Sequence, residues 1–435
     1  MAYDITVGRN TSDKEVFGNK GLVYLGKGYV KMGNYTSLSN TIHMDVARSH
    51  VVLVAGKRGT GKSYTLGVIA EELANLPQDT AKNIASIIFD TMGIFWTMKY
   101  KNEKDLALLK EWGLESKPLD VNVFVPHGKA EQYRRQGIPV DSTFALNASE
   151  LKAEDWLTLF GIEMTSLPGV MIERIVSKRN FLKKKYTIQD IVDDVNADME
   201  SSDSTKEVVR GLFMAAASWG IFSETEEGTE IKDLVSAGKT TVLDVSVFSS
   251  IGSCNVRALV INLIARKLFE ERMDARKKEE LGSIREGKSY LTFTEHKNPL
   301  IWMFIDEAHE FLPKNGKTPA TDALIQILRE GRQPGISIVM ATQQPGQIHH
   351  DVMTQSDIVI AHRVTAKQDI EALNEIMQTY VVDSIRKQLD NLPSLKGSAL
   401  VLDDNSERIY PIRVRPRSTW HGGEAPTAVK TEFNI

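Results

Sequence analysis

The stretch VVLVAGKRGTGKS at 51–63 limits the fold more than any other part of the sequence. Its first six residues, VVLVAG, form an apolar run that is typical of a strand buried on both faces of a parallel sheet. The run leads into GKRGTGKS (56–63), which matches the pattern G-x-x-x-x-G-K-[ST], and a helical pattern follows at 63–76. A strand, a glycine-rich loop and a helix in this order predict an α/β fold that binds phosphate where the helix begins.

Each residue type in this loop has a physical role. Glycines let the backbone turn tightly, so that amide N–H groups and the positive end of the helix face phosphate oxygens. Lys62 would reach the β and γ phosphates, and the Ser63 hydroxyl would ligate Mg²⁺. We therefore expect ATP and Mg²⁺ as cofactors, with a purely structural glycine turn as the alternative. The candidate nucleotide-binding residues are Gly56, Arg58, Gly59, Thr60, Gly61, Lys62, Ser63 and Tyr64.

A second candidate motif is LIWMFIDEAHEF at 300–311. Asp306 follows the apolar run directly, which would place it at the end of a buried strand beside the phosphate loop, where it can hold Mg²⁺ through a water. Glu307 can orient the attacking water and deprotonate it. The alternative is that both acids cap the following helix. His309 is either a supporting hydrogen-bonding residue or a catalytic one.

Two further polar residues end apolar runs. Gln343 closes ISIVMATQ (336–343), from where its amide would touch the γ phosphate or the attacking water. Alternatively, Gln343 is a strand-end residue whose amide is satisfied by hydrogen bonds within the protein and has no role in catalysis. Asp90 closes ASIIFD (85–90) and would either help to position water or metal, or form a turn.

Two arginines stand near the end of a predicted helix, in LREGRQPG at 328–335. An arginine presented to the γ phosphate of a neighbouring subunit stabilises the negative charge of the transition state. We favour Arg332 over Arg329 for this catalytic role. A solvated surface charge or a salt bridge within the chain is the alternative for both.

Apolar runs that read as strands alternate with helical spacing along much of the chain, which predicts a parallel sheet covered on both faces. A long helix is expected from about Asn255 to Glu280, followed by a polar loop at 281–298. The expected core strands are 51–56, 85–90, 240–247, 300–306, 336–343 and 357–364. The predicted parts are a small N-terminal β unit at 1–48, a core at 49–100 and 236–420, a mainly helical insertion at 101–235 and a tail at 421–435 that either lacks order or lies across a neighbour.

The formal net charge of −4 does not favour a protein that coats nucleic acid. It is compatible with a ring that encloses DNA, because only the channel must then be basic. The basic stretches at 178–179, 183–185 and 276–278 are interpreted as solvated helix faces, with DNA binding as the alternative. The only cysteine, Cys254, is interpreted as a buried, inert thiol. With no signal-like start and no apolar run long enough to span a bilayer, we expect a cytoplasmic protein without membrane association.

Taken together, these motifs resemble those of the HerA-like ATPases, which are hexameric DNA translocases allied to FtsK. The likeness rests on VVLVAGKRGTGKS, FIDEAHEFLP, REGRQPGISIVMATQQPGQIHHDVMTQSDIVIAHRVT and the closing RVRPRSTWHGG. It implies a RecA-like P-loop NTPase core with a helical insertion and a small N-terminal β unit. It also implies a hexamer with ATP between subunits, Arg332 supplied by the neighbour, duplex DNA in the channel, and a NurA-like nuclease or another effector as partner.

The sequence departs from this family at two places. The N-terminal β unit is shorter than the usual barrel, and DTMGIF stands where relatives often carry D-P-H-G-E-Y. We expect an ATP-driven motor that moves double-stranded DNA in end processing, repair or defence. The alternatives are an ATP-dependent scaffold that activates an effector, and a DEAH-type helicase, which would need a second RecA-like domain in the residues that follow Asp306.

Overall fold

The computed structural model describes residues 4–32, 35–248, 255–287, 298–376, 385–424 and 428. Its strands are hydrogen-bonded into one sheet of 13 strands. In chain order these are β1 (Ile5–Val7), β2 (Leu22–Met32), β3 (Tyr35–Asp45), β4 (Val51–Ala55), β5 (Ile84–Asp90), β6 (Val121–Pro126), β7 (Ser142–Phe144), β8 (Thr240–Asp244), β9 (Leu300–Ile305), β10 (Ile336–Thr342), β11 (Ile358–His362), β12 (Ser398–Asp403) and β13 (Arg408–Val414).

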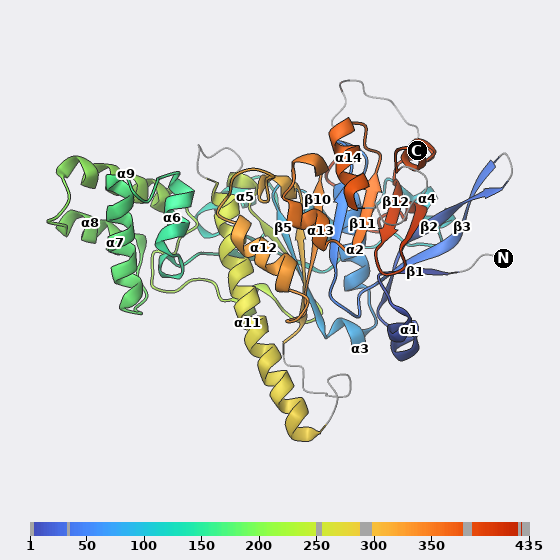
Figure 1. The fold of residues 1–435 in the computed structure, drawn as a ribbon, viewed down its shortest axis with the longest axis horizontal. Coiled ribbons are helices and arrows are strands. Elements are labelled where there is room, and N and C mark those ends of the chain that lie inside the picture. Colours follow the sequence, from blue (N-terminus) through green and yellow to red (C-terminus); the bar gives the residue numbers. More distant parts are fainter. Residues whose placement is uncertain are drawn as a thin grey trace.

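Along the chain, the α helices of the described residues alternate with these strands or groups of strands (Figure 1). They are α1 (Thr11–Phe17), α2 (Lys62–Ala74), α3 (Gln78–Ala81), α4 (Leu106–Glu111), α5 (Ala130–Arg135), α6 (Ala153–Phe160), α7 (Leu167–Phe181), α8 (Ile188–Ala197), α9 (Asp203–Ser218), α10 (Ile231–Leu234), α11 (Val256–Glu286), α12 (Thr321–Glu330), α13 (His350–Gln355), α14 (Lys367–Ile376) and α15 (Ile385–Asp390).

Eight neighbouring strands form a parallel core in the order β11-β4-β10-β9-β5-β8-β6-β7. Alternate residues of β4 face opposite sides: Val52 and Val54 join the hydrophobic cluster that includes Leu66 of α2, and Leu53 joins the cluster that includes Leu259 of α11. Both faces of the sheet are therefore covered, which explains why the core strands are continuous apolar runs. The predicted α/β fold with a mainly parallel sheet is confirmed.

The remaining strands make the sheet mixed. β12 and β13, which were not among the expected strands, continue the sheet beyond β11 as an antiparallel pair, and β2 pairs with β13. The N-terminal unit of β1, β2 and β3 is therefore an extension of the same sheet rather than a separate barrel.

The region 101–235, expected to be mainly helical, also contributes two strands to the core. β6 pairs with β8, and β7 pairs with β6 at the end of the sheet. Beyond this end, helices α6 to α9 form a group at the opposite pole of the molecule from β1 to β3 (Figure 1). Aromatic rings hold the group together, with the ring centroids of Trp156 and Phe213 4.9 Å apart.

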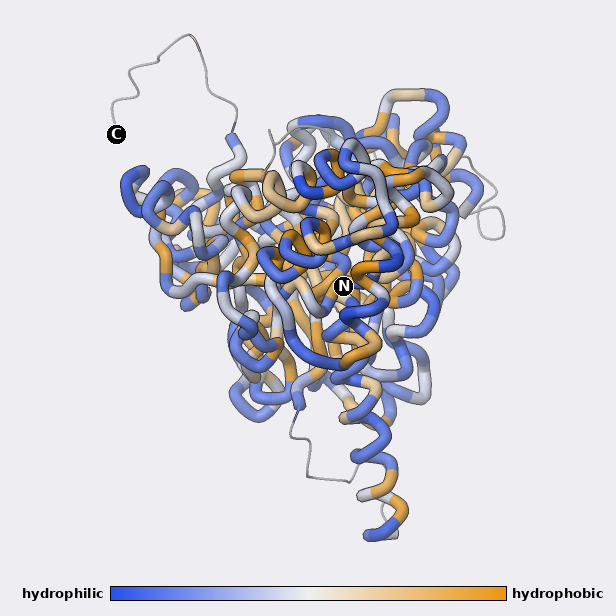
Figure 2. The backbone as a smooth tube through the Cα atoms, turned by 90° about the vertical axis from the view of Figure 1, so that its left-hand side faces the viewer, coloured by the Kyte–Doolittle hydropathy of each residue, from blue (hydrophilic) through white to orange (hydrophobic). Residues whose placement is uncertain are grey.

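Helix α11 extends well beyond the body of the molecule (Figure 2). It is 31 residues long, or about 46 Å at 1.5 Å per residue. The Asn255 side chain caps its start by accepting a hydrogen bond from the Ala258 N–H, and Gly287 ends it in a left-handed conformation. The helix thus occupies the beginning of the expected loop at 281–298. Cys254 lies outside the described residues, and no described helix has the length and apolar character that crossing a membrane requires.

Candidate nucleotide-binding site

The loop between β4 and α2 has the backbone shape that its glycines predict. Gly59 and Gly61 have φ angles of 78° and 108°, which residues with side chains rarely adopt. At Gly56, an added Cβ would lie 2.6 Å from Thr60 Oγ1 and 2.7 Å from the Cβ of His362, so close packing excludes any larger residue. The loop is therefore built for a tight turn directly ahead of the helix.

The first turn of α2 is open to an anion. Gly61, the residue before the helix, makes no side-chain capping hydrogen bond to the first N–H groups of the helix, and these groups have no partner within the helix itself. Lys62 is buried, and its Nζ donates a 3.4 Å hydrogen bond to the carbonyl oxygen of Lys57 in the loop. These features fit phosphate groups held by backbone amides and one lysine.

Asp306 lies at the same edge of the sheet, directly after β9. Only β10 separates β9 from β4, the strand that leads into the loop. Burial raises the pKa of the Asp306 carboxyl, while a hydrogen bond with the Ser63 side chain and the nearby charge of Lys62 oppose the rise. Asp306 Oδ1 accepts a 2.9 Å hydrogen bond from the N–H of Glu307, whereas Oδ2 is buried without a hydrogen-bond partner among the described residues. A free, buried carboxylate oxygen beside a serine hydroxyl fits the hard oxygen ligands that Mg²⁺ prefers.

Glu307 adopts a left-handed backbone conformation with φ 51° and ψ 45°. Such a conformation is strained in a residue with a side chain and is often found at functional sites. Its side chain is 17% exposed, and its Oε2 lies 3.5 Å from Nδ1 of His309. Burial and the negative charge of Asp306 raise the pKa of Glu307 to about 7, against the nearby positive charge of Lys62. A carboxylate with a pKa near 7 is well matched to accept a proton from water.

The alternative role for these acids, capping the next helical turn, receives no support at Glu307, whose side chain makes no capping hydrogen bond. His309 Nδ1 also lies 3.4 Å from Oγ1 of Thr342, the last residue of β10. Burial lowers the pKa of His309, so its ring is neutral near pH 7. Gln343 follows Thr342 and is half-buried at the end of the strand between β4 and β9.

Three other candidates differ in their surroundings. Arg58 is exposed in the loop, and its charge acts on Glu307. The Tyr64 hydroxyl accepts a 2.6 Å hydrogen bond from the backbone N–H of Arg417, so Tyr64 contacts the C-terminal segment. Asp90 forms a turn: its carboxylate accepts four backbone hydrogen bonds, from the N–H groups of Met92, Gly93, Ile94 and Phe95.

The two candidate arginines lie away from the phosphate loop of their own chain. Arg332 is exposed in the turn before β10, whereas Gln343 follows the other end of that strand. Seven residues of strand separate the two sheet edges by about 23 Å. Arg329 forms an ion pair with Asp351, with an N–O distance of 2.7 Å. That ion pair is the structural alternative left open for Arg329.

A buried charge cluster beside α2 was missed in the sequence. Glu71 is fully buried and pairs with Arg415 Nη2 at 2.9 Å and with Arg417 Nε at 3.2 Å. It also accepts 3.0 Å hydrogen bonds from the N–H groups of Ser418 and Thr419. Burial by itself would raise the pKa of Glu71, but the two guanidinium groups hold it below its ordinary value. The sequence signals for this cluster are Glu71 within the apolar IAEEL, and Arg415 and Arg417 within RVRPRST.

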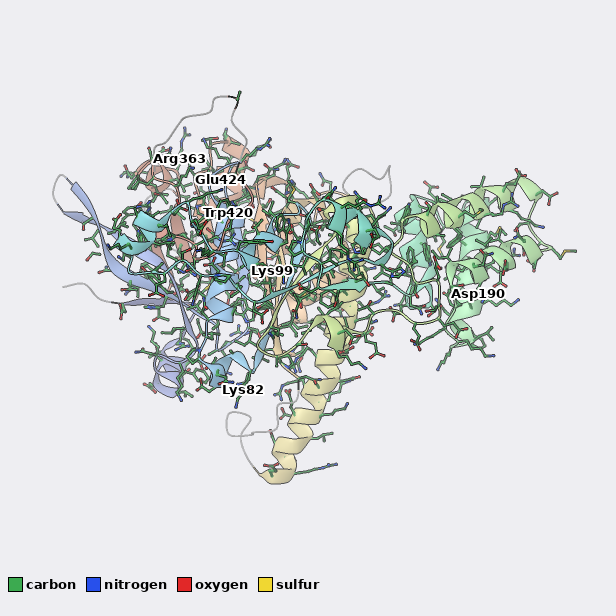
Figure 3. All side chains as sticks on the ribbon, turned by 180° about the vertical axis from the view of Figure 1, so that it is seen from behind. Lys82, Lys99, Asp190, Arg363, Trp420 and Glu424 are labelled. Carbon is green, nitrogen blue, oxygen red and sulfur yellow. The ribbon has the colours of Figure 1, made fainter. Side chains whose placement is uncertain are left out.

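The segment that carries these arginines continues over its own subunit. The Trp420 N–H donates a 2.7 Å hydrogen bond to the Tyr100 carbonyl oxygen, and Glu424 pairs with Lys104 at 2.8 Å. Trp420 and Glu424 lie far from Asp190 in the helical group (Figure 3). Residues 421–424 of the expected tail therefore contact their own chain, and all later tail residues except 428 lie outside the described part.

His362, at the end of β11, packs against the phosphate loop. It was not among the site residues predicted from the sequence. Its Nε2 lies 2.9 Å from Thr65 Oγ1, and its Nδ1 lies 3.2 Å from the Ser398 carbonyl oxygen. Burial lowers the pKa of His362 to about 4, so the ring that lies beside Gly61 of the loop is neutral.

The sheet, the glycine loop and the adjacent acids define a P-loop NTPase. The profile for the central domain of helicase HerA matches residues 28–268, and the profile for the HerA-like helicase C-terminal region matches 293–415. The chain therefore belongs to the HerA helicase family, which confirms the resemblance seen in the sequence.

Two proteins named DNA double-strand break repair helicase HerA are among its relatives. The one from Pyrococcus furiosus is 28% identical over 178 residues, which cover 37% of this chain and 30% of that protein. The one from Sulfurisphaera tokodaii is 21% identical over 372 residues, covering 85% and 65%. The chain thus spans less than two thirds of the length of these two relatives.

Solved structures show the same fold at low sequence identity. VirB4 of Thermoanaerobacter pseudethanolicus is 12% identical with a TM-score of 0.56, covering 92% of this chain and 97% of that one. The bacterial conjugative coupling protein TrwB is also 12% identical, with a TM-score of 0.50 and coverage of 86% and 87%. Both support the assignment of an α/β core of this class.

Proposed function

We propose that this protein hydrolyses ATP and uses the energy to translocate double-stranded DNA. The observation that carries the proposal is the convergence of Lys62, Ser63, Asp306 and Glu307 at one sheet edge, with the pKa of Glu307 raised to about 7. A site that only binds nucleotide has no need of a strained, partly buried carboxylate next to the metal-binding position.

In this proposal each side chain has one task. The amides of the loop and Lys62 would bind the phosphates, and Ser63 and Asp306 would hold Mg²⁺. The metal would neutralise charge on the transferred phosphoryl group. Glu307 accepts the proton of the attacking water on a carboxylate oxygen, and Gln343 contacts the γ phosphate or that water.

We further propose that the protein works as a homo-oligomeric ring, most simply a hexamer, with ATP between subunits. Arg332 supports this arrangement, because it is exposed at the sheet edge opposite its own phosphate loop. In a ring this edge of one subunit faces the nucleotide of the next, and Arg332 would complete that site. Arg329 is the weaker candidate because Asp351 already pairs with it.

Duplex DNA as the substrate, and DNA end processing, repair or defence as the setting, rest on the HerA relatives, whose names describe double-strand break repair helicases. A NurA-like nuclease or another effector is the proposed partner. A DEAH-type helicase is disfavoured, since the described strands after Asp306, β10 to β13, all belong to the first sheet.

The proposal is tested by the ATPase rate with and without duplex DNA, together with the mass of the particle with and without ATP. We expect a ring-sized particle whose ATPase rate rises several-fold with duplex DNA, and Lys62→Ala as the inactive control. An ATPase rate that is indifferent to duplex DNA would contradict translocation and favour an ATP-dependent scaffold.

A further inference from the structure

Arg272 of α11 is a buried cation directed at the turn that carries Arg332. Its Nε donates a 2.8 Å hydrogen bond to the Pro334 carbonyl oxygen, and its Nη1 donates a 3.0 Å hydrogen bond to the Asn298 carbonyl oxygen. Nη1 also pairs with Glu279 of the same helix at 3.2 Å. The side chains of Arg272 and Glu279 are 3% and 5% exposed.

The turn is also anchored at both ends by backbone hydrogen bonds. The Gly331 N–H donates to the Ile327 carbonyl oxygen in α12, and the Ile336 N–H donates to the Gly331 carbonyl oxygen, both at 2.8 Å. Arg332 is exposed between these fixed points. The direction of the Arg332 side chain therefore depends on the conformation of this turn. Arg272 of α11 fixes that conformation through its hydrogen bond to Pro334.

A buried ion pair is a poor source of stability, because desolvation offsets most of its attraction. What it supplies is geometry: the planar guanidinium offers several donors in a fixed fork, which a lysine does not. At this position the fork joins the turn to the residues that precede β9, and Glu279 balances its charge.

We propose that Arg272 is a positioning residue for the arginine that each subunit presents to its neighbour. This inference rests on the proposed role of Arg332. Arg272 touches no nucleotide itself; it fixes the turn so that Arg332 reaches the γ phosphate of the next subunit. Misplacement of a catalytic group by about 1 Å costs on the order of 100-fold in rate.

The test uses Arg272→Lys in the full-length protein, with Lys277→Ala as the matched control on the same helix, because the Lys277 side chain is 69% exposed. For Arg272→Lys we expect ATP affinity within about twofold of wild type and a kcat lower by about 10- to 100-fold. For Lys277→Ala we expect no change in either. A wild-type kcat in Arg272→Lys would overturn the proposal.

Mixed rings separate positioning from general damage. Arg272→Lys keeps its own phosphate loop, and Lys62→Ala keeps its arginine turn, so about a quarter of the interfaces in randomly mixed rings combine both intact halves. We expect partial recovery of ATPase activity in this mixture, and none when Arg272→Lys is mixed with Arg332→Ala.

A corresponding mixture of Arg332→Ala with Lys62→Ala distinguishes the proposed role of Arg332 between subunits from the proposed positioning role of Arg272. If it recovers activity and the Arg272→Lys mixture does not, Arg272 has only a structural role and the inference fails alone. If neither mixture recovers activity in verified rings, the arginine does not act between subunits and both proposals fail.

Discussion

The carboxylate of Glu71 lies 3.2 Å from Nε of Arg417, a residue 346 positions later in the chain. Glu71 belongs to α2, the helix that begins at the phosphate loop, and Arg417 belongs to the segment that follows the last strand of the sheet. Both side chains are about 1% exposed. The C-terminal segment is therefore joined to the nucleotide-binding helix through a buried charge.

Removing this charge is expected to destabilise the protein. Glu71→Ala leaves Arg415 and Arg417 buried without their shared partner, which costs about 3–5 kcal/mol. Glu103→Ala is the control, since Glu103 and its ion-pair partner Lys101 are both exposed and such surface pairs add little to stability. Chemical denaturation measures both. Equal stability losses in the two variants would show that the cluster does not hold the segment in place.

Glu307→Gln is expected to bind ATP with unchanged affinity and to hydrolyse none. The amide has nearly the shape of the carboxylate but accepts no proton from water. Calorimetry measures binding and phosphate release measures turnover. Glu310→Gln is the control, because Glu310 pairs with Arg257 near the surface. Normal turnover in Glu307→Gln would remove it as the general base.

The ATPase rate is expected to rise with pH through about 7. Burial and the charge of Asp306 raise the pKa of Glu307 to about 7, so its basic form accumulates only above this pH. A profile of kcat against pH, at saturating ATP and Mg²⁺, measures the midpoint. A kcat that stays flat between about pH 6 and 8 would be inconsistent with this role.

Arg329→Ala and Arg332→Ala are expected to differ sharply. Loss of an arginine that acts between subunits lowers kcat by on the order of 1,000-fold. We expect this for Arg332→Ala. Arg329→Ala loses an ion pair in which the arginine side chain is 59% exposed, worth less than about 1 kcal/mol of stability, and keeps its activity. The reverse pattern of ATPase rates would assign the role to Arg329 instead.

Because of His50, the folding stability of the protein is expected to fall as the pH rises from about 6.5 to 9. Burial alone would lower its pKa, but Nδ1 lies 2.6 Å from Asp357 and Nε2 lies 3.1 Å from Asp45, and these carboxylates raise the pKa to about 9. Because the folded pKa lies above the ordinary value of about 6.5, the folded state binds the proton more tightly. The stabilisation, about 3 kcal/mol, is complete below pH 6.5 and is lost as pH rises through 9.

Urea denaturation at several pH values, in wild type and in His50→Asn, measures this contribution. The loss of stability between about pH 6.5 and 9 should be smaller in the variant. An identical loss in both proteins would mean that His50 is not charged in the folded state at neutral pH.

The parts of the fold that were predictable from sequence are those with a strong local pattern. The apolar runs at 51–56 and 300–306 correspond closely to β4 and β9, because strands buried on both faces need apolar residues throughout. The glycine loop was predictable because glycine adopts the positive φ angles found at Gly59 and Gly61 far more readily than other residues do.

The missed features depend on partners distant in the chain. β6 pairs with β8, which lies more than 100 residues later in the chain. In the sequence Glu71 resembles any helical glutamate, because its partners Arg415 and Arg417 lie near the other end of the chain. His362 ends a strand, and nothing beside it in sequence shows that the phosphate loop packs on its ring. Local pattern contains no information about such long-range pairs.

The continuous sheet has a mechanical consequence. Between β2 of the N-terminal unit and β4 lie only β13, β12 and β11, each hydrogen-bonded to the next. A load applied to the N-terminal strands is therefore transmitted to the phosphate loop through the backbone ladder, with no flexible linker to absorb it. In the proposed motor, a partner that bears on this end of the subunit would therefore displace the loop that is proposed to bind the nucleotide.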